Sequence, residues 1–374
     1  METNLESHYR GFRTPIARWA RFGPYYAMFP IDFTFEIVNK YSKQGDYVLD
    51  PFAGRCSSIY ASAALDRHGI GIEINPIGWL YGSVKLHPAQ KDVVIKRLGQ
   101  IYIDRYKYHE EVNELPEFFF YCFCKDVLLF LVSARQSLNW KINHTDATLM
   151  SILLVYLHGK LGEGLSNQMR QTKAMGDTYS IKWWKSKNME KPPNINPYEF
   201  ILKKINWRYL KGTPDLLTHS KVYLADSEIE FSKVENYLNK KQTKCSLLFT
   251  SPPYCGITDY HVDQWLRLWL LGGNDKPKSS PEKNKGRFNS KTDYIELLDR
   301  VFNNCSKVMA QDSVIYVRTD ARNFTYNATI SALEKNFPSY NMEIKAKPFK
   351  NRTQTQLFGD FTPKKGEIDI ILSR

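Results

Sequence analysis

The stretch that decides the fold is Leu247–Tyr254, which reads Leu-Leu-Phe-Thr-Ser-Pro-Pro-Tyr. Its apolar beginning predicts a buried strand. The two prolines lack a backbone N–H and fix their own φ, and the residue before each is pushed into an extended conformation. This pattern predicts a stiff, open loop at the carboxyl end of a strand, where open α/β sheets bind their ligands. The candidate catalytic residues are therefore Ser251, Pro252, Pro253 and Tyr254.

A second ligand-binding signal lies near the start of the chain. A short strand at 47–50 leads into a turn that ends in glycine, a helix of small residues follows at 59–65, and a strand at 69–73 ends in an acid. Such a glycine lets backbone approach a ligand, and such an acid accepts both hydroxyls of a ribose. A plain βαβ unit without a ligand is the alternative. The candidate cofactor-binding residues here are Asp50, Phe52, Gly54 and Glu73.

The α/β pattern resumes late in the chain. A strand that ends in the acid Asp226 begins at residue 221, and a helix at about 228–240 leads into the stretch that contains the two prolines. Further helices are predicted at 293–309 and 328–336, and further strands at 313–318, 342–347 and 367–372. The last two strands resemble a hairpin. The pattern predicts an α/β, Rossmann-like fold with a mostly parallel sheet and a late antiparallel hairpin.

A largely helical insert interrupts this pattern. Apolar spacing predicts helices at 91–108, 117–138, 145–159 and 197–211. We therefore divide the chain into a first part at 1–80 that carries the cofactor half, an insert at 81–215, and a second part at 216–374 that carries the catalytic half. The insert is the expected target-recognition region.

Basic and aromatic side chains gather within the insert. Arginine and lysine contact phosphates, arginine also reads guanine, and tryptophan stacks on bases. The alternative is a solvated basic loop whose tryptophans pack on neighbouring helices. The candidate nucleic-acid-binding residues are Arg170, Lys173, Lys182, Trp183, Trp184 and Lys185.

Composition narrows the class of partner. The chain has 374 residues and a formal net charge of +13, which favours a polyanionic partner. Six scattered cysteines show no metal-ligand spacing, so we expect buried thiols and no metal site. The polar segment 1–13 lacks an apolar signal core and no run is long enough to span a bilayer. The expected location is the cytoplasm, without a membrane.

Together, the segment Asp50–Gly54 and the later Ser251–Tyr254 resemble the DNA amino-methyltransferases, which use S-adenosyl-L-methionine to modify cytosine N4 or adenine N6. The resemblance covers roughly residues 15–80 and 220–374. The insert, however, precedes the strand of Asp226 rather than following it, which departs from the family's α arrangement.

The resemblance implies a role for each matched residue. Phe29 and Pro30 pack near the methionine part of the cofactor, and the loop from Asp50 to Gly54 lies against it. Glu73 holds the ribose hydroxyls and Asp226 faces the adenine amine. The Ser-Pro-Pro-Tyr loop holds a flipped-out base, with Tyr254 stacked on it.

The same resemblance predicts a reaction. A serine at position 251 favours cytosine N4, since aspartate is commoner there in enzymes that act on adenine. The expected partners are double-stranded DNA and, in a restriction–modification or defence system, a cognate endonuclease. The alternatives are an adenine-N6 methyltransferase that acts on DNA or RNA, and an inactive nucleic-acid-binding protein of the same fold.

Overall fold

The structure is a computed structural model that describes residues 5–25, 28–216, 219–256, 259–278, 290–347 and 366–374. It divides into two compact units, each made of three separate segments. The helical unit comprises Met1–Asp32, Asn75–Leu216 and Asp259–Pro281, and the sheet unit comprises Phe33–Ile74, Leu217–Thr258 and Glu282–Arg374. The boundaries of these units differ from those of the predicted division. Residues 1–32 and 259–281, which the prediction assigned to the two parts of the α/β domain, fall in the helical unit.

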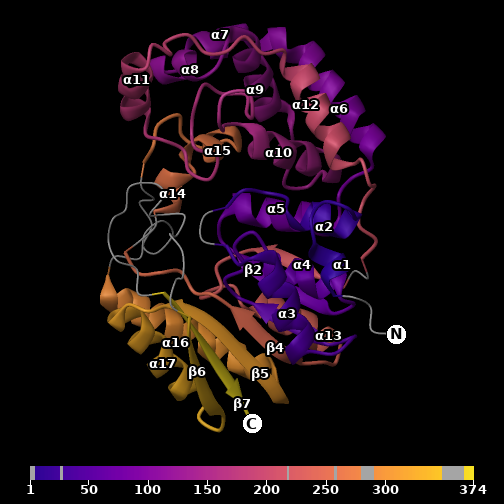
Figure 1. Ribbon diagram of the computed structural model, residues 1–374, viewed down its shortest axis with the longest axis vertical. Helices are drawn as coiled ribbons and strands as arrows, with labels where there is room; N and C mark the ends of the chain where they lie inside the picture. The colour runs from indigo at the N-terminus through magenta and orange to yellow at the C-terminus, as the bar shows by residue number, and fades with distance from the viewer. Residues whose placement is uncertain (1–4, 26–27, 217–218, 257–258, 279–289, 348–365) are drawn as a thin grey trace. The chain divides into compact units, whose positions relative to one another are not determined.

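The sheet unit holds a seven-stranded sheet in the order β3-β2-β1-β4-β5-β7-β6 (Figure 1). Strands β1 to β5 pair in parallel, whereas β7 lies antiparallel between β5 and β6. The predicted α/β fold with a mostly parallel sheet and a late antiparallel hairpin is thus confirmed. The strands are β1 Tyr47–Asp50, β2 His68–Glu73, β3 Lys221–Leu224, β4 Cys245–Thr250, β5 Met309–Asp320, β6 Asn341–Lys347 and β7 Glu367–Ser373.

Helices cover both faces of this sheet. On one face, Leu49, Leu248 and Ile315 join the apolar side chains of α13, α16 and α17 in one core. On the other face, Phe33 of α3 packs against Phe249, and α4 packs against β1 and β2. The strands β1, β2 and β4 are therefore buried on both sides, as their apolar sequences require, whereas β3 and β6 at the two edges of the sheet are half-buried or exposed. These helices are α3 Ile31–Tyr41, α4 Ser57–Ala64, α13 Ser232–Lys240, α16 Lys291–Val308 and α17 Asn323–Asn336.

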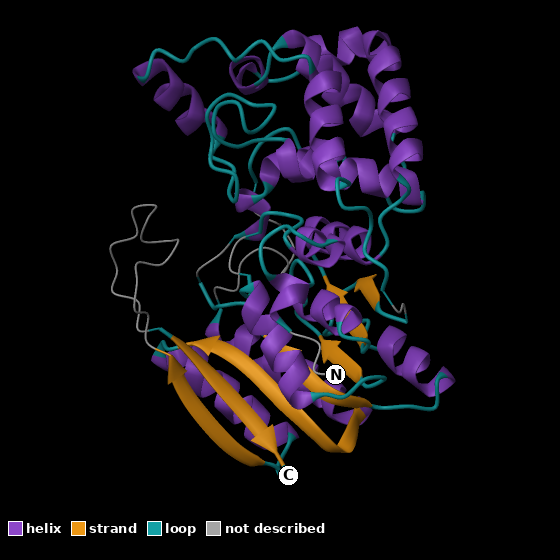
Figure 2. Ribbon diagram, turned by 45° about the vertical axis from the view of Figure 1, so that its right-hand side comes forward, coloured by secondary structure: helices purple, strands orange, loops and turns teal. Residues whose placement is uncertain are grey.

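The described part of the helical unit consists of helices and loops (Figure 2). The four predicted helices of the insert are present, although the one expected at 117–138 is broken by the extended backbone of Phe123. The larger helices are α2 Pro15–Ala20, α5 Pro76–Leu86, α6 Lys91–Asp104, α8 Glu117–Cys122, α9 Lys125–Ser137, α10 His144–Tyr156, α11 Asp177–Ser186, α12 Pro197–Arg208 and α15 Trp265–Leu270. The shorter ones are α1 Glu6–Tyr9, η1 Arg105–Tyr108, α7 His109–Asn113 and α14 Tyr260–Asp263.

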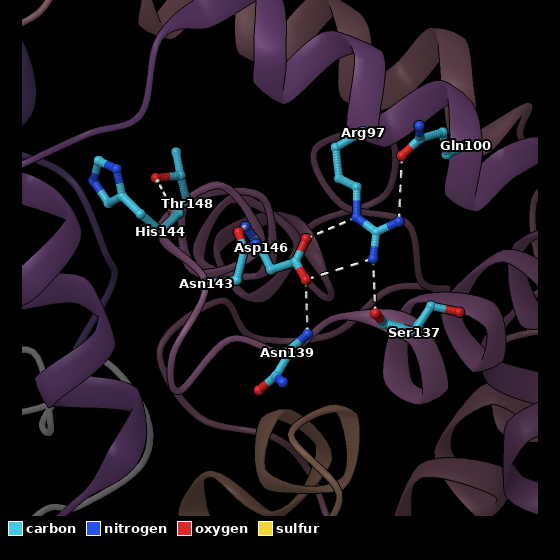
Figure 3. A network of polar contacts seen from close by, with 8 residues as sticks. All are labelled: Arg97, Gln100, Ser137, Asn139, Asn143, His144, Asp146 and Thr148. Atoms are coloured by element: carbon cyan, nitrogen blue, oxygen red, sulfur yellow. Dashed lines mark hydrogen bonds and ion pairs between the residues drawn. The ribbon is translucent and has the colours of Figure 1, made fainter.

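A polar network fastens three of these helices to one another (Figure 3). Arg97 of α6 forms an ion pair with Asp146 of α10 at 2.7 Å and donates to the carbonyl of Ser137, the last residue of α9. Asp146 also accepts from the backbone N–H of Asn139, while the Asn143 side chain caps the start of α10. Because Asp146 is buried, this carboxylate is satisfied by protein groups rather than by water.

Candidate active site

The predicted cofactor and catalytic residues of the sheet unit meet at one edge of the sheet. Asp50 and Glu73 are the last residues of β1 and β2, Asp226 follows β3, and Ser251 follows β4. These four strands are neighbours and run parallel, so their carboxyl ends share an edge. The chain progresses outward from β1 to β3 on one side and from β4 to β5 on the other. The gap between β1 and β4 is therefore the switch point, where such sheets bind ligands.

The loop after β1 is folded back onto the end of β2. Gly54 adopts φ +55°, and its backbone N–H donates to Oε2 of Glu73 at 2.6 Å. The Ala53 N–H donates to the carbonyl of Ile72 at 3.0 Å. Cys56, which precedes α4, also lies in the left-handed region with φ +60°. Hydrogen bonds thus fix the loop after β1 to the end of β2 and to Glu73, and Gly54 lies where the backbone must turn.

Asp50 is buried and hydrogen-bonded to protein groups on both carboxylate oxygens. Oδ1 accepts from the Phe52 N–H at 3.1 Å and from the Thr250 hydroxyl at 2.6 Å, and Oδ2 accepts from the Ser58 hydroxyl. Burial raises the pKa of Asp50 to about 6, although these hydrogen bonds oppose the rise. Asp50 therefore stabilises the loop after β1 through buried hydrogen bonds.

Asp226 is half-buried and shapes the turn after β3. Its Oδ1 accepts from the Glu228 N–H at 2.9 Å, and its own N–H donates to Oε2 of Glu230 at 3.0 Å. The Ala225 N–H donates to the carbonyl of Glu73, which continues the link between β2 and β3. Two carboxylates thus lie at consecutive strand ends beside a glycine loop. These two acceptors suit an adenosine, whose ribose hydroxyls and amine both donate hydrogen bonds.

Two glycines of β2 were not singled out in the sequence analysis. A Cβ at Gly69 would lie 2.8 Å from Ile59 Cγ2, and a Cβ at Gly71 would lie 2.9 Å from Ile59 Cγ1. Only glycine therefore lets α4 approach the sheet this closely, which sets the position of the loop that precedes α4. The alternation of glycine with isoleucine in residues 69–72 was the available signal.

The predicted catalytic residues follow β4 without regular secondary structure. Pro252 is buried, while Ser251, Pro253 and Tyr254 are half-buried. Burial raises the pKa of Tyr254, and the negative charges of Glu367 and Asp320 raise it further, while Ser251 and Arg318 oppose the rise. The phenol is therefore neutral at physiological pH, as a ring that stacks on a base would be.

Beside Tyr254, a buried ion pair joins β5 to β7. Arg318 donates to Asp369 through Nε at 2.6 Å and Nη2 at 2.9 Å, and its guanidinium lies 3.6 Å from the centre of the Phe33 ring. Glu367 is a second anionic partner at 3.2 Å. The sequence analysis missed this pair, because a charged residue within each apolar strand gives no sign of its partner.

Phe29 and Pro30 lie in the helical unit, just before α3, with Phe29 half-buried and Pro30 exposed. Their predicted contact with the cofactor stays a prediction.

The candidate nucleic-acid-binding residues of the insert fall into different environments. Trp184 is fully buried, packs on Phe118 and donates its Nε1–H to the Gln168 carbonyl at 2.8 Å. Its ring belongs to the core of the helical unit, so the prediction that Trp184 stacks on bases is wrong. Lys173 forms an ion pair with Asp263, a carboxylate that is buried.

The remaining candidates are more accessible. Arg170, Lys182 and Lys185 are exposed, and Trp183 is half-buried. Lys182, Trp183 and Lys185 all lie on α11, and Lys185 also lies over the Tyr121 ring, with its Nζ 5.2 Å from the centre. Residues that are three apart lie on one side of a helix, so α11 presents Lys182 and Lys185 together.

Within the described ranges, no three His, Cys, Asp or Glu side chains come together to hold a metal ion. No helix in the described part of the chain is long and apolar enough to cross a membrane.

Comparison with known proteins points in the same direction as the site. Residues 4–77 match a family model described as DNA methylase, and this range contains the candidates from Phe29 to Glu73. A curated relative, the Type II methyltransferase M.MthZI of Methanothermobacter thermautotrophicus, is 39% identical over 49 residues. That match spans 13% of this chain and 14% of the relative.

Solved structures show only a distant likeness. A precorrin-6y C5,15-methyltransferase from Geobacter metallireducens is 8% identical with a TM-score of 0.36, and the match covers 94% of each chain. The ribosomal RNA methyltransferase aviRa from Streptomyces viridochromogenes is 10% identical with a TM-score of 0.33, over 98% of this chain and 96% of that one. Scores this low carry no argument about activity. The likeness to known methyltransferases at the level of sequence is therefore confined to residues 4–77 for the DNA methylase model and to 49 residues for the curated relative.

Proposed function

We propose that this protein transfers a methyl group from S-adenosyl-L-methionine to the N4 amine of a cytosine flipped out of double-stranded DNA. The observation that carries the proposal is the position of the Ser251–Tyr254 loop. It follows β4, directly across the switch point from the glycine loop that follows β1. A methyl donor held by the β1 loop and an amine held by the β4 loop would therefore meet at one edge of the sheet.

In this proposal, cofactor binding belongs to the ends of β1, β2 and β3. The carboxylate of Glu73 accepts the ribose hydroxyls, and Asp226 lies where an adenine amine would need an acceptor. The side chain of Phe52 and the backbone of Gly54 line the loop. The family resemblance implies that Phe29 and Pro30 contact the methionine part of the cofactor. When bound, the cofactor supplies an electrophilic methyl group on a sulfonium.

The catalytic loop would activate a poor nucleophile. The amine nitrogen of cytosine is weakly nucleophilic, because its lone pair is delocalised into the ring. Two acceptors in fixed positions, the Ser251 hydroxyl and the Pro252 carbonyl, hold the two amine hydrogens and direct the lone pair toward the methyl group. Tyr254 stacks on the flipped base. Serine is no base at neutral pH, so the proton leaves to water after transfer.

Binding of DNA would fall to the basic surface of the helical unit. The net charge of +13 favours a polyanion, and α11 presents Lys182 and Lys185 beside Trp183. Arg170 is a further exposed cation. Lys173 contributes less in this proposal, because Asp263 already neutralises it. The match to a Type II methyltransferase favours a restriction–modification or defence role with a partner endonuclease.

The adenine-N6 alternative rests on one observation. The matching family model bears the name N6_N4_Mtase, which covers both amines. The serine at position 251 favours cytosine, since the family resemblance associates aspartate with adenine.

The test is incubation of the protein with plasmid DNA and isotopically labelled S-adenosylmethionine, followed by mass spectrometry of the nucleosides. Labelled N4-methylcytosine is expected. Labelled N6-methyladenine would establish the alternative, and no label in either base would overturn the proposal. Ser251→Ala should abolish the label. The matched control is Ser246→Ala on the same strand, which loses only a weak 3.4 Å bond to the Tyr47 carbonyl and should keep the label.

A further inference from the structure

Asp50 links three parts of the sheet unit that lie apart in the sequence. Its carboxylate accepts from Phe52 in the glycine loop, from Ser58 in α4 and from Thr250 at the end of β4. Asp50 is 1% exposed and Thr250 is fully buried. Oδ1 is shared between the loop and the strand end, so this single atom joins the two sides of the switch point.

Backbone pairing does not make this connection. The register between β1 and β4 consists of Val48 with Leu247 and of Leu49 with Leu248. This register does not extend to Asp50 or Thr250. The bond between the Thr250 hydroxyl and Asp50, at 2.6 Å, thus joins the last residues of the two strands, beyond their paired residues. A buried hydrogen bond to a carboxylate is short and strong, which suits it to fix a distance.

We propose that Thr250 is a positioning residue, whose hydroxyl, through Asp50, sets the spacing between the Ser251 loop and the glycine loop. This inference rests on the proposed function. Thr250 directly precedes Ser251, but its side chain is fully buried and its hydroxyl bonds to Asp50, so it would touch neither substrate nor cofactor. A displacement of about 1 Å between reacting groups lowers a rate by about 100-fold. Loss of the Thr250 hydroxyl should therefore slow the methyl-transfer step and leave cofactor binding unchanged. The glycine loop keeps its bond to Glu73, and Asp50 keeps its bond to Ser58.

The decisive comparison is Thr250→Val with Thr250→Ser. Valine keeps the volume and removes the hydroxyl, whereas serine keeps the hydroxyl and removes a methyl group. We expect Thr250→Val to lower the single-turnover rate of methyl transfer by about 10- to 100-fold. Its Kd for S-adenosylmethionine, measured by calorimetry, should change less than about threefold. Thr250→Ser should keep a rate within about threefold of the wild type.

A matched control is Thr329→Val, which removes another buried hydroxyl of the sheet unit, bonded at 2.8 Å to the Thr325 carbonyl within α17. It should leave the single-turnover rate unchanged.

Should Thr250→Val fail to fold, Thr250→Cys replaces it, since a thiol is a weak donor. Because the thiol keeps a weak hydrogen bond to Asp50, the rate of Thr250→Cys should lie below that of Thr250→Ser, about tenfold below the wild type.

The inference is overturned if the valine variant transfers methyl groups at the wild-type rate, or if its rate and cofactor affinity fall by the same factor. A serine variant as slow as the valine variant would also overturn it. These outcomes presuppose an active wild type. A wild-type protein that methylates no base refutes the proposed function instead, so the two failures are distinguishable.

Discussion

Replacing Asp369 with alanine removes the main anion that holds Arg318 inside the sheet unit. Arg318 is 5% exposed and Asp369 is fully buried, so neither group can turn to water. The variant loses the two hydrogen bonds that Arg318 donates to Asp369, at 2.6 and 2.9 Å, and leaves a buried guanidinium. Breaking a buried pair by removing one partner costs about 3–5 kcal/mol. Because Glu367 remains at 3.2 Å, we expect the lower end, about 3 kcal/mol.

The assay must report on the sheet unit. The chain has eight tryptophans, and all lie in the segments of the helical unit, so their fluorescence follows that unit. Native-state exchange of backbone amides in β5 and β7, read by mass spectrometry, gives the free energy of opening of the sheet itself. We expect Asp369→Ala to lower that free energy by about 3 kcal/mol.

Two comparisons separate this account from a general effect of substitution. Glu296→Ala removes an exposed partner of Arg300 on α16, at 3.2 Å, and should change stability by no more than about 0.5 kcal/mol. The double variant Arg318→Met with Asp369→Leu removes both charges, so it should be more stable than Asp369→Ala alone. A loss below about 1 kcal/mol for Asp369→Ala would refute the reasoning.

Three further predictions concern the site. Ser251→Ala and Tyr254→Ala should each lower methyl transfer strongly while calorimetry finds S-adenosylmethionine affinity within about threefold of the wild type; loss of binding in both would count against their roles. Glu73→Ala should weaken cofactor binding by about 10- to 100-fold, as expected for lost hydrogen bonds to a charged group, and an unchanged Kd would remove Glu73 from the cofactor site. For Asp50, the folded pKa of about 6 lies above the usual 3.8, so its contribution to stability is present below about pH 4 and is lost as the pH rises through about 6. Relative to Asp50→Asn, the sheet unit should therefore lose up to about 3 kcal/mol between pH 4 and pH 7, measured by amide exchange, and a pH-independent difference would contradict that assignment.

The sequence predicted the elements of the sheet unit closely, because each strand is a short apolar run that ends in a distinctive residue. The strand at Tyr47–Asp50 has the predicted bounds. The carboxyl ends of β1 to β4 carry Asp50, Glu73, Asp226 and the Ser-Pro-Pro-Tyr loop as expected. Local signals suffice there, since burial on both faces leaves β1, β2 and β4 little choice of residue.

Contacts between distant segments were beyond local patterns. Asp50 was expected to bind a ligand, but its partner Thr250 is 200 positions away in the chain, and only the pairing of β1 with β4 brings them together. Trp184 was misjudged for a similar reason. Tryptophans between lysines are typical of surfaces that stack on bases. On the helix α11, however, Trp184 lies on the buried side, while Lys182 and Lys185 are exposed. Sequence spacing on α11 carried that information.

Some predictions concern residues outside the described ranges. The lysines, prolines and glycines of residues 272–290 predict a loop, and residues 279–289 of it are not described. The polar segment at 351–360, which separates the last two strands in the sequence, also lies outside the described ranges. The order of the segments is nevertheless informative. The segment between β2 and β3 supplies most of the helical unit, which also includes residues before Phe33 and after Thr258.

The most direct test of the central claim is sequencing of modified bases in DNA from a host that expresses this protein. The account predicts N4-methylcytosine at one recurring sequence motif, absent from a host that expresses Ser251→Ala. Unmodified DNA, or methyl groups confined to adenine N6, would contradict it.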